Sequence, residues 1–139
     1  MKEINKAPQI GELYLVDFDG CGSEQKGKRP GLVFQNNTGN KYSPNIIVLP
    51  LTSSLKKSGQ PTHVVIPANE QTGLRKDSMV LCENPICVSK ERLGSYLTTL
   101  PQDYMAQISV AYLLATSAIS FIDPCLLTAL WQKSVLLNS

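Results

Sequence analysis

The sequence of 139 residues has one histidine, His63, and lacks the common nucleotide-binding and hydrolase signatures. A single histidine excludes the ribonuclease mechanisms that use one histidine as base and another as acid. The chain has no phosphate-binding Gly-Lys-Ser/Thr loop, no dinucleotide fingerprint and no Gly-x-Ser-x-Gly nucleophile elbow. Nucleotide hydrolysis by a phosphate-binding loop, dinucleotide-dependent redox chemistry and serine hydrolysis therefore lack their usual residues.

Long apolar runs are also missing. No stretch approaches the roughly 18 consecutive apolar residues that a membrane-spanning helix needs. The charged start, residues 1–6, is followed by no apolar segment of the kind found in secretory leaders. We therefore expect a cytoplasmic protein with no membrane partner.

The four cysteines include no Cys-x-x-Cys pair, and their spacing does not complete a common zinc set with His63. They are Cys21, Cys82, Cys87 and Cys125. In the cytosol we expect reduced, mostly buried thiols, with a Cys82–Cys87 disulfide as the lesser alternative. Asp17 and Asp19 share one face of a predicted strand, but two carboxylates without a third nearby supply few ligands for a divalent metal ion. No metal and no cofactor are expected.

The length suits one domain with a tail. Short apolar or alternating segments separated by turn residues predict strands at 11–19, 31–35, 45–49, 62–66 and 78–82. Residues 36–44 are dense in Asn, Gly and Ser and predict a turn or long loop. Pro50 predicts a strand end, an edge or a bulge. The pattern indicates an α+β fold, mainly β, built as a small antiparallel barrel or sandwich.

The apolar period changes to that of a helix at Pro101. Met105, Ile108, Tyr112, Ala115 and Ile119 follow at steps of three and four, which predicts one long helix packed on the strands. Asp123-Pro124 repeats a helix start signal. We divide the chain into a domain at 1–122 and an extension at 123–139. Two alternatives are open for the extension. It is a short apolar helix that covers an apolar patch on the barrel or on a dimer partner, or it is a flexible tail.

Positive charge gathers in the middle of the chain. Between Lys26 and Arg92 there are ten basic and four acidic residues, a net of +6 in a chain whose total is +2. Scattered surface lysines explain this excess. A basic face for a polyanion such as RNA explains it equally.

Three residues near the cationic loop at 22–30 have the chemistry to cleave RNA. RNA carries its own nucleophile, the 2′-hydroxyl, so cleavage needs charge stabilisation, a base and a proton donor. Arg29 can bind a phosphate through its fork of donors. Thr52 can donate a hydrogen bond to a phosphate oxygen, and Glu24 is the nearest proton acceptor along the chain.

These residues lie within segments that closely resemble the MazF/PemK family of toxin endoribonucleases. The matching segments begin with GELYLVDF at 11–18, GSEQ at 22–25 with Arg29-Pro30, and QNNTGNKYSP at 35–44. They continue with PLTS at 50–53, PTHV at 61–64, KDS at 76–78 and KERLG at 90–94. The resemblance runs in order over roughly residues 10–122.

The resemblance implies an SH3-like barrel with a long C-terminal helix that works as a homodimer. It implies metal-independent cleavage of single-stranded RNA at a short sequence, leaving a 2′,3′-cyclic phosphate and a 5′-hydroxyl, and a cognate antitoxin with an acidic, flexible segment. Carried over by position, the catalytic residues are Arg29, Thr52 and Glu24. The RNA-binding residues are Ser23, Gln25, Lys28 and Asn84.

One departure from the family pattern affects the expected activity. Family members commonly read Glu-Gln-Ile-Arg-Thr-Ile-Asp where this chain reads ENPICVS at 83–89, so Ile86 replaces an arginine. A weakened nuclease that still binds RNA or antitoxin is therefore one alternative. A second is a binding module on the same barrel, like the relatives that poison DNA gyrase.

Overall fold

The structure is a computed structural model that describes residues 6–19, 26–56 and 58–139. Its strands are β1 (Glu12–Asp19), β2 (Lys26–Val33), β3 (Asn45–Thr52), β4 (His63–Ile66), β5 (Ser78–Leu81), β6 (Ile86–Ser89) and β7 (Leu93–Thr99). Its α-helices are α1 (Asn37–Tyr42), α2 (Gln102–Thr116) and α3 (Leu127–Leu137). Short 3-10 turns are η1 (Lys90–Arg92), η2 (Ala118–Phe121) and η3 (Pro124–Leu126).

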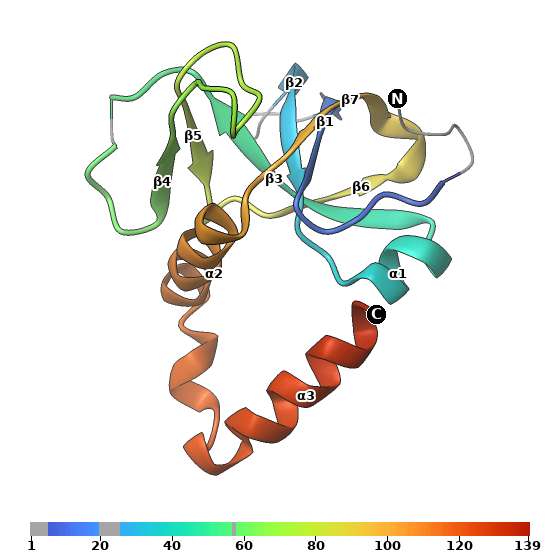
Figure 1. The fold of residues 1–139 in the computed structure, drawn as a ribbon, viewed down its shortest axis with the longest axis vertical. Coiled ribbons are helices and arrows are strands. Elements are labelled where there is room, and N and C mark those ends of the chain that lie inside the picture. The colour runs from blue at the N-terminus through green and yellow to red at the C-terminus, as the bar shows by residue number, and fades with distance from the viewer. Residues whose placement is uncertain (1–5, 20–25, 57) are drawn as a thin grey trace.

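The strands form one antiparallel sheet in the order β4-β5-β3-β2-β1-β7, with β6 added beside β3 (Figure 1). The predicted class, mainly β with a long helix near the C-terminus, is confirmed. Within the described residues, β4 and β7 end the strand order without pairing to each other, so the closed barrel is not confirmed. The sheet is strongly bent, with α2 and α3 on one side of it.

β3 organises the sheet because it changes partner along its length. Residues 45–48 pair with β6, whereas Leu51 and Thr52 pair with Val80 and Met79 of β5. The change falls at Pro50, which has no N–H to donate to a ladder. The predicted irregularity at Pro50 is therefore a switch of partner, and β3 continues beyond it to Thr52.

Several sequence-based assignments were wrong. Residues 36–44 are not a loop, because Asn36 caps α1 by accepting a 2.8 Å hydrogen bond from Gly39 N at its side-chain Oδ1. The end of the predicted loop at 22–30 is strand, since β2 begins at Lys26. β6 and β7 were not predicted. Asp123 does start a helical segment, as expected, by accepting from Cys125 N at 2.9 Å.

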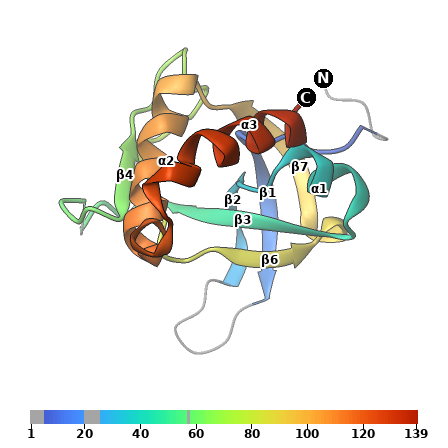
Figure 2. The same cartoon turned by 90° about the horizontal axis from the view of Figure 1, so that it is seen from below.

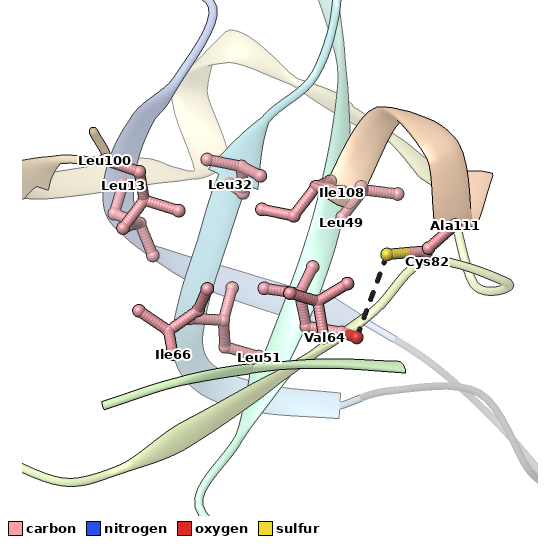
Figure 3. Close-up of a cluster of buried hydrophobic side chains, with 11 residues drawn as sticks. Leu13, Leu32, Leu49, Leu51, Val64, Ile66, Cys82, Leu100, Ile108 and Ala111 are labelled. Atoms are coloured by element: carbon pink, nitrogen blue, oxygen red, sulfur yellow. Dashed lines mark hydrogen bonds between the residues drawn. The ribbon is translucent and has the colours of Figure 1, made fainter. Parts of the chain in front are cut away.

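Two apolar clusters form the core. The larger contains Leu13, Leu32, Leu49, Leu51, Val64, Ile66, Val80, Cys82, Leu100, Ile108 and Ala111, most of which Figure 3 labels. The smaller contains Tyr14, Val16, Phe18, Val33, Ile46, Val48 and Val88. Burial of these side chains is the main favourable contribution to folding.

The predicted helical stripe is confirmed over its first part. Ile108 is fully buried, and Met105 and Tyr112 pack beside it on the larger cluster. Ile119 was placed on the stripe wrongly. α2 ends at Thr116 because Ser117 adopts a left-handed conformation with φ 55°, which breaks the helical path before residue 119.

After α2 the chain turns back, and α3 runs across the lower side of the sheet toward α1 (Figure 2). The C-terminal end of α3 meets α1 through two hydrogen bonds: Asn37 N donates to Asn138 Oδ1 and Thr38 Oγ1 donates to the Leu137 carbonyl, both at 2.9 Å. In the described part of the chain, no helix has the length and apolar character to cross a membrane.

The cysteines differ in exposure. Cys82 is buried, whereas Cys87 and Cys125 are exposed, so the expectation of mostly buried thiols was wrong for these two; Cys21 lies outside the described residues. All three are free thiols, and the alternative Cys82–Cys87 disulfide is not formed. Burial, with a smaller contribution from the charge of Glu83, raises the pKa of the Cys82 thiol to about 12.

This contrast predicts different thiol reactivities. Because the thiolate is the nucleophile, Cys82 should react with iodoacetamide at pH 8 at least about 100-fold more slowly than Cys87 and Cys125. Residue-resolved mass spectrometry of the folded protein measures this difference. Denaturant should equalise the three rates, and equal rates in the folded protein would contradict the burial of Cys82.

Candidate active site

A cleft of about 900 Å³ opens where the strands β1, β2, β3 and β7 approach the connection between β4 and β5. Its wall includes Leu15 of β1, Tyr96 of β7 and the residues around the end of β3. Two of the predicted catalytic residues, Arg29 and Thr52, line it together.

The β2–β3 register explains why these two residues meet. The paired positions are Val33 with Val48, Leu32 with Leu49, and Gly31 with Pro50. Arg29 precedes the last paired residue of β2 by two positions, and Thr52 follows the last paired residue of β3 by two positions, so both lie just beyond the paired part of these neighbouring strands. Both residues line the same cleft. Arg29 is exposed and Thr52 is half-buried, so both are accessible to a ligand in the cleft.

Local hydrogen bonding orients the Thr52 hydroxyl. Ser54 N donates to Thr52 Oγ1 at 3.1 Å. This bond uses a lone pair of the oxygen, and a hydroxyl that accepts in this way retains its own proton as a donor. The hydroxyl is therefore prepared to donate to an anionic ligand.

The loop at 67–77, between β4 and β5, supplies two further cations to the cleft, Arg75 and Lys76. The buried Thr72 holds the loop: its Oγ1 donates to the Pro67 carbonyl at 2.6 Å and its N–H donates to Asn69 Oδ1 at 2.9 Å. The sequence reading counted these cations in the basic middle segment but did not assign them to the site.

The cleft is electropositive. Lys28, Arg29, Arg75 and Lys76 line it, and no Asp or Glu is among its lining residues in the described part of the chain. Such a surface attracts polyanions and concentrates them at its mouth. Part of the positive charge that gathers between Lys26 and Arg92 therefore lies together in this cleft.

Tyr96 forms an aromatic part of the wall. Its ring meets Tyr14 edge-on with centroids 5.8 Å apart, and its hydroxyl lies 2.6 Å from Thr99 Oγ1. Desolvation, together with the nearby charge of Glu12, raises the pKa of Tyr14. Held from two sides and 39% exposed, Tyr96 offers a fixed ring surface to a ligand.

The remaining predicted site residues are placed differently. Ser23, Glu24 and Gln25 lie outside the described residues. Asn84 lies in the turn after β5, where its N–H donates to the Leu81 carbonyl at 3.2 Å, and it does not line the cleft. Ile86, which stands where the family pattern has arginine, packs against the smaller apolar cluster.

Comparison with known proteins agrees with the resemblance found in the sequence. The model of the PemK-like, MazF-like toxins of type II toxin-antitoxin systems matches residues 9–113. The chain belongs to this family. In this toxin, α3 and the segment before it therefore lie beyond the part that the family model matches.

Two curated relatives are named endoribonucleases. Endoribonuclease EndoA of Bacillus subtilis strain 168 is 38% identical over 112 residues, which cover 80% of this chain and 96% of the relative. Endoribonuclease MazF of Staphylococcus epidermidis is 42% identical over 102 residues, which cover 73% of this chain and 84% of the relative.

Solved structures share the fold. MazF from Deinococcus radiodurans superposes with a TM-score of 0.71 at 26% identity, covering 81% of this chain and 99% of that one. A mycobacterial endoribonuclease in complex with its cognate antitoxin superposes with a TM-score of 0.68 at 25% identity, covering 81% and 97%.

Proposed function

We propose that this toxin is a metal-independent endoribonuclease that cleaves single-stranded RNA at a short sequence, with Arg29 and Thr52 acting on the scissile phosphate. The observation that carries the proposal is that both residues, from the neighbouring strands β2 and β3, line one electropositive cleft. The names of the two curated relatives support the same activity.

The reaction needs no external nucleophile. The 2′-oxygen attacks the adjacent phosphorus, the bond to the 5′-oxygen breaks, and the products carry a 2′,3′-cyclic phosphate and a 5′-hydroxyl. Negative charge grows on the non-bridging oxygens in the transition state, where the Arg29 guanidinium and the Thr52 hydroxyl stabilise it. Glu24 is proposed as the base that accepts the 2′-hydroxyl proton, and the leaving 5′-oxygen takes up a proton.

The rest of the cleft suits an unpaired strand. Lys28, Arg75 and Lys76 can neutralise phosphates on either side of the cleavage site. The fixed ring of Tyr96 can stack on one base. Ser23 and Gln25 are proposed as further RNA contacts because they match family positions, and Asn84 because it stands where many family members carry glutamine.

Replacing Arg75 and Lys76 together with glutamine should weaken RNA binding with a smaller dependence on salt. Each phosphate contact contributes about 0.7 to the slope of log affinity against log salt for a single strand, so the slope should fall by roughly 1.4. Fluorescence anisotropy with a 2′-O-methyl oligonucleotide measures binding without cleavage.

Lys133 provides the matched control, because it is an exposed cation on α3 and does not line the cleft. Its replacement with glutamine should leave the slope unchanged. Equal effects of the two changes would mean that RNA responds to net charge and not to this cleft.

The partners follow from the proposed activity. The similar mycobacterial endoribonuclease was solved in complex with its cognate antitoxin, which supports a cognate antitoxin for this chain. An acidic, flexible antitoxin segment would compete with RNA for the four cations of the cleft, Lys28, Arg29, Arg75 and Lys76.

We also infer that the toxin is a homodimer, that it acts on mRNA in the cytoplasm, and that it shares the SH3-like barrel architecture of the family. The change of partner along β3, which bends the sheet, supports this last inference.

Incubating the purified toxin with total RNA in EDTA tests the proposed function. Fragments with 5′-hydroxyl ends, labelled directly by polynucleotide kinase, are the expected result. Substrates that carry 2′-O-methyl groups should stay intact because they lack the nucleophile. Intact RNA together with inhibited gyrase supercoiling would instead indicate the gyrase-binding alternative, and intact RNA that is still bound would indicate a weakened nuclease.

A further inference from the structure

The loop at 67–77 packs tightly against β7 at Gly73. This glycine adopts a left-handed conformation with φ 70°. A β-carbon at this position would lie 2.4 Å from Thr98 Oγ1 and 2.9 Å from Thr98 Cβ, which is closer than non-bonded atoms approach. Glycine fits here because it lacks the β-carbon and adopts this backbone conformation without strain.

The contact between Gly73 and Thr98 joins the two ends of the strand order. The loop follows β4, whereas Thr98 lies on β7, and in the described part of the chain these two strands do not pair with each other. Thr98 is half-buried in a strand whose other residues are mostly exposed. A packed contact therefore connects the two ends of the sheet at a place where no strand ladder does so.

Hydrogen bonds within the loop fix the backbone around Gly73. Gly73 N donates to the Asn69 carbonyl at 2.9 Å. Ala68 N donates to Asp77 Oδ1 at 2.7 Å, which links the two ends of the loop. Leu74, next to the glycine, packs against the larger apolar cluster. Because the loop is held at these points, a displacement at Gly73 would be passed to the residues that follow Leu74.

The residues that follow are the two loop cations of the cleft. Arg75 is two residues from Gly73 along the loop, and Tyr96 is two residues from Thr98 along β7. Both Arg75 and Tyr96 line the cleft, together with Lys76. The contact between the loop and β7 therefore sets how far the two cations stand from the Tyr96 ring.

We propose that Gly73 and Thr98 are positioning residues for RNA binding. Their contact holds the loop cations at the distance from the Tyr96 ring that lets one nucleotide place its base on the ring and its phosphate on the cations. Such preorganisation lowers the cost of ordering the site when the strand binds. The inference rests on the proposed function, because it assigns the cleft to RNA.

Gly73→Ala tests this contact, because the added carbon does not fit against Thr98. The variant should raise the Kd of a 2′-O-methyl oligonucleotide about tenfold at low salt and reduce the salt slope by up to roughly 1.4, the loss expected for two phosphate contacts. In steady-state cleavage of the unmodified oligonucleotide, KM should rise while kcat stays within about twofold, since Arg29 and Thr52 are unchanged.

Gly11→Ala is the matched control for backbone strain. Gly11 also has a positive φ, of 94°, but the three atoms nearest to a β-carbon there belong to Met105, at ordinary contact distances of 3.7 to 3.9 Å. This control should lower the melting temperature without changing the Kd or the salt slope. Thr98→Gly removes all three atoms near the carbon that Gly73→Ala adds, so the double variant should recover part of the lost binding.

Thr98→Ile enlarges the other side of the contact without strain at residue 73. It should change the Kd and the salt slope in the same direction as Gly73→Ala, and it carries the test if Gly73→Ala does not fold. Unchanged binding by both variants would overturn the proposal.

A comparison in a second background separates positioning from general destabilisation. Added to Arg75→Gln/Lys76→Gln, Gly73→Ala should cause no further fall in the salt slope, because the cations through which it acts are gone. A further fall of the same size would mean that the glycine acts on the whole fold, and would overturn the proposal. If the unmodified chain itself binds no RNA, the proposed function fails and this inference fails with it, whereas RNA binding that ignores Gly73→Ala and Thr98→Ile sinks this inference alone.

Discussion

Replacing Arg29 with alanine is expected to lower the rate of single-stranded RNA cleavage about 10³-fold, measured in EDTA under single-turnover conditions. In the proposed mechanism the guanidinium opposes charge that grows on the phosphate only as the 2′-oxygen attacks, and loss of one such donor costs about 10² to 10³ in rate. The larger value is expected because an arginine carries a full charge and can direct two donors at one phosphate.

Two neighbouring variants control this prediction. Arg29→Lys keeps the charge but loses the planar fork of donors, so it should recover only part of the rate. Lys28→Ala removes an exposed cation from the same cleft and should reduce cleavage only a fewfold, through binding. Arg29 is exposed, so the melting temperature should stay the same. Undiminished cleavage by Arg29→Ala would remove this residue from the mechanism.

Replacing Ile108 with alanine is expected to lower the free energy of unfolding by about 3 kcal/mol, a change of more than 100-fold in the unfolding equilibrium. Ile108 is fully buried and attaches α2 to the larger apolar cluster. The change removes apolar contacts and leaves a cavity that the surrounding strands only partly close. Urea denaturation followed by circular dichroism measures it.

Val110 is the matched control on the same helix, because it is 59% exposed. Val110→Ala should change stability by less than about 0.5 kcal/mol. Similar losses for the two variants would contradict the orientation of α2 on the sheet. In the cleft, neither variant removes a lining side chain.

The strands with clear apolar patterns could be predicted from the sequence, and the others could not. β1 carries buried residues at the alternating positions Tyr14, Val16 and Phe18, and β3 is a continuous apolar run that is mostly buried, so both patterns are visible in the sequence. β7 is mostly exposed, and its Ser and Thr residues hide the pattern. α1 has a composition typical of turns, and its helical state depends on the cap that Asn36 provides.

The site shows a similar division. Arg29 and Thr52 were found from their chemistry and from the family resemblance, whereas the pairing of β2 with β3, which brings both residues to one cleft, belongs to the folded sheet. Arg75 and Lys76 were missed as site residues because they lie on the loop between β4 and β5, and the conformation of this loop, which Thr72 holds by hydrogen bonds to Pro67 and Asn69, leaves no pattern in the sequence. Counting charges along the sequence identified the basic segment but could not show which of its cations line the cleft.

The most direct test of the central claim is a double-mutant cycle between Arg29→Ala and Thr52→Val, with the cleavage rate of one RNA oligonucleotide as the readout. If both side chains act on the same phosphate, their effects should not be independent, and the double variant should lose clearly less than the product of the two single losses. Strictly multiplicative losses, or a Thr52→Val variant as fast as the unmodified toxin, would contradict the account.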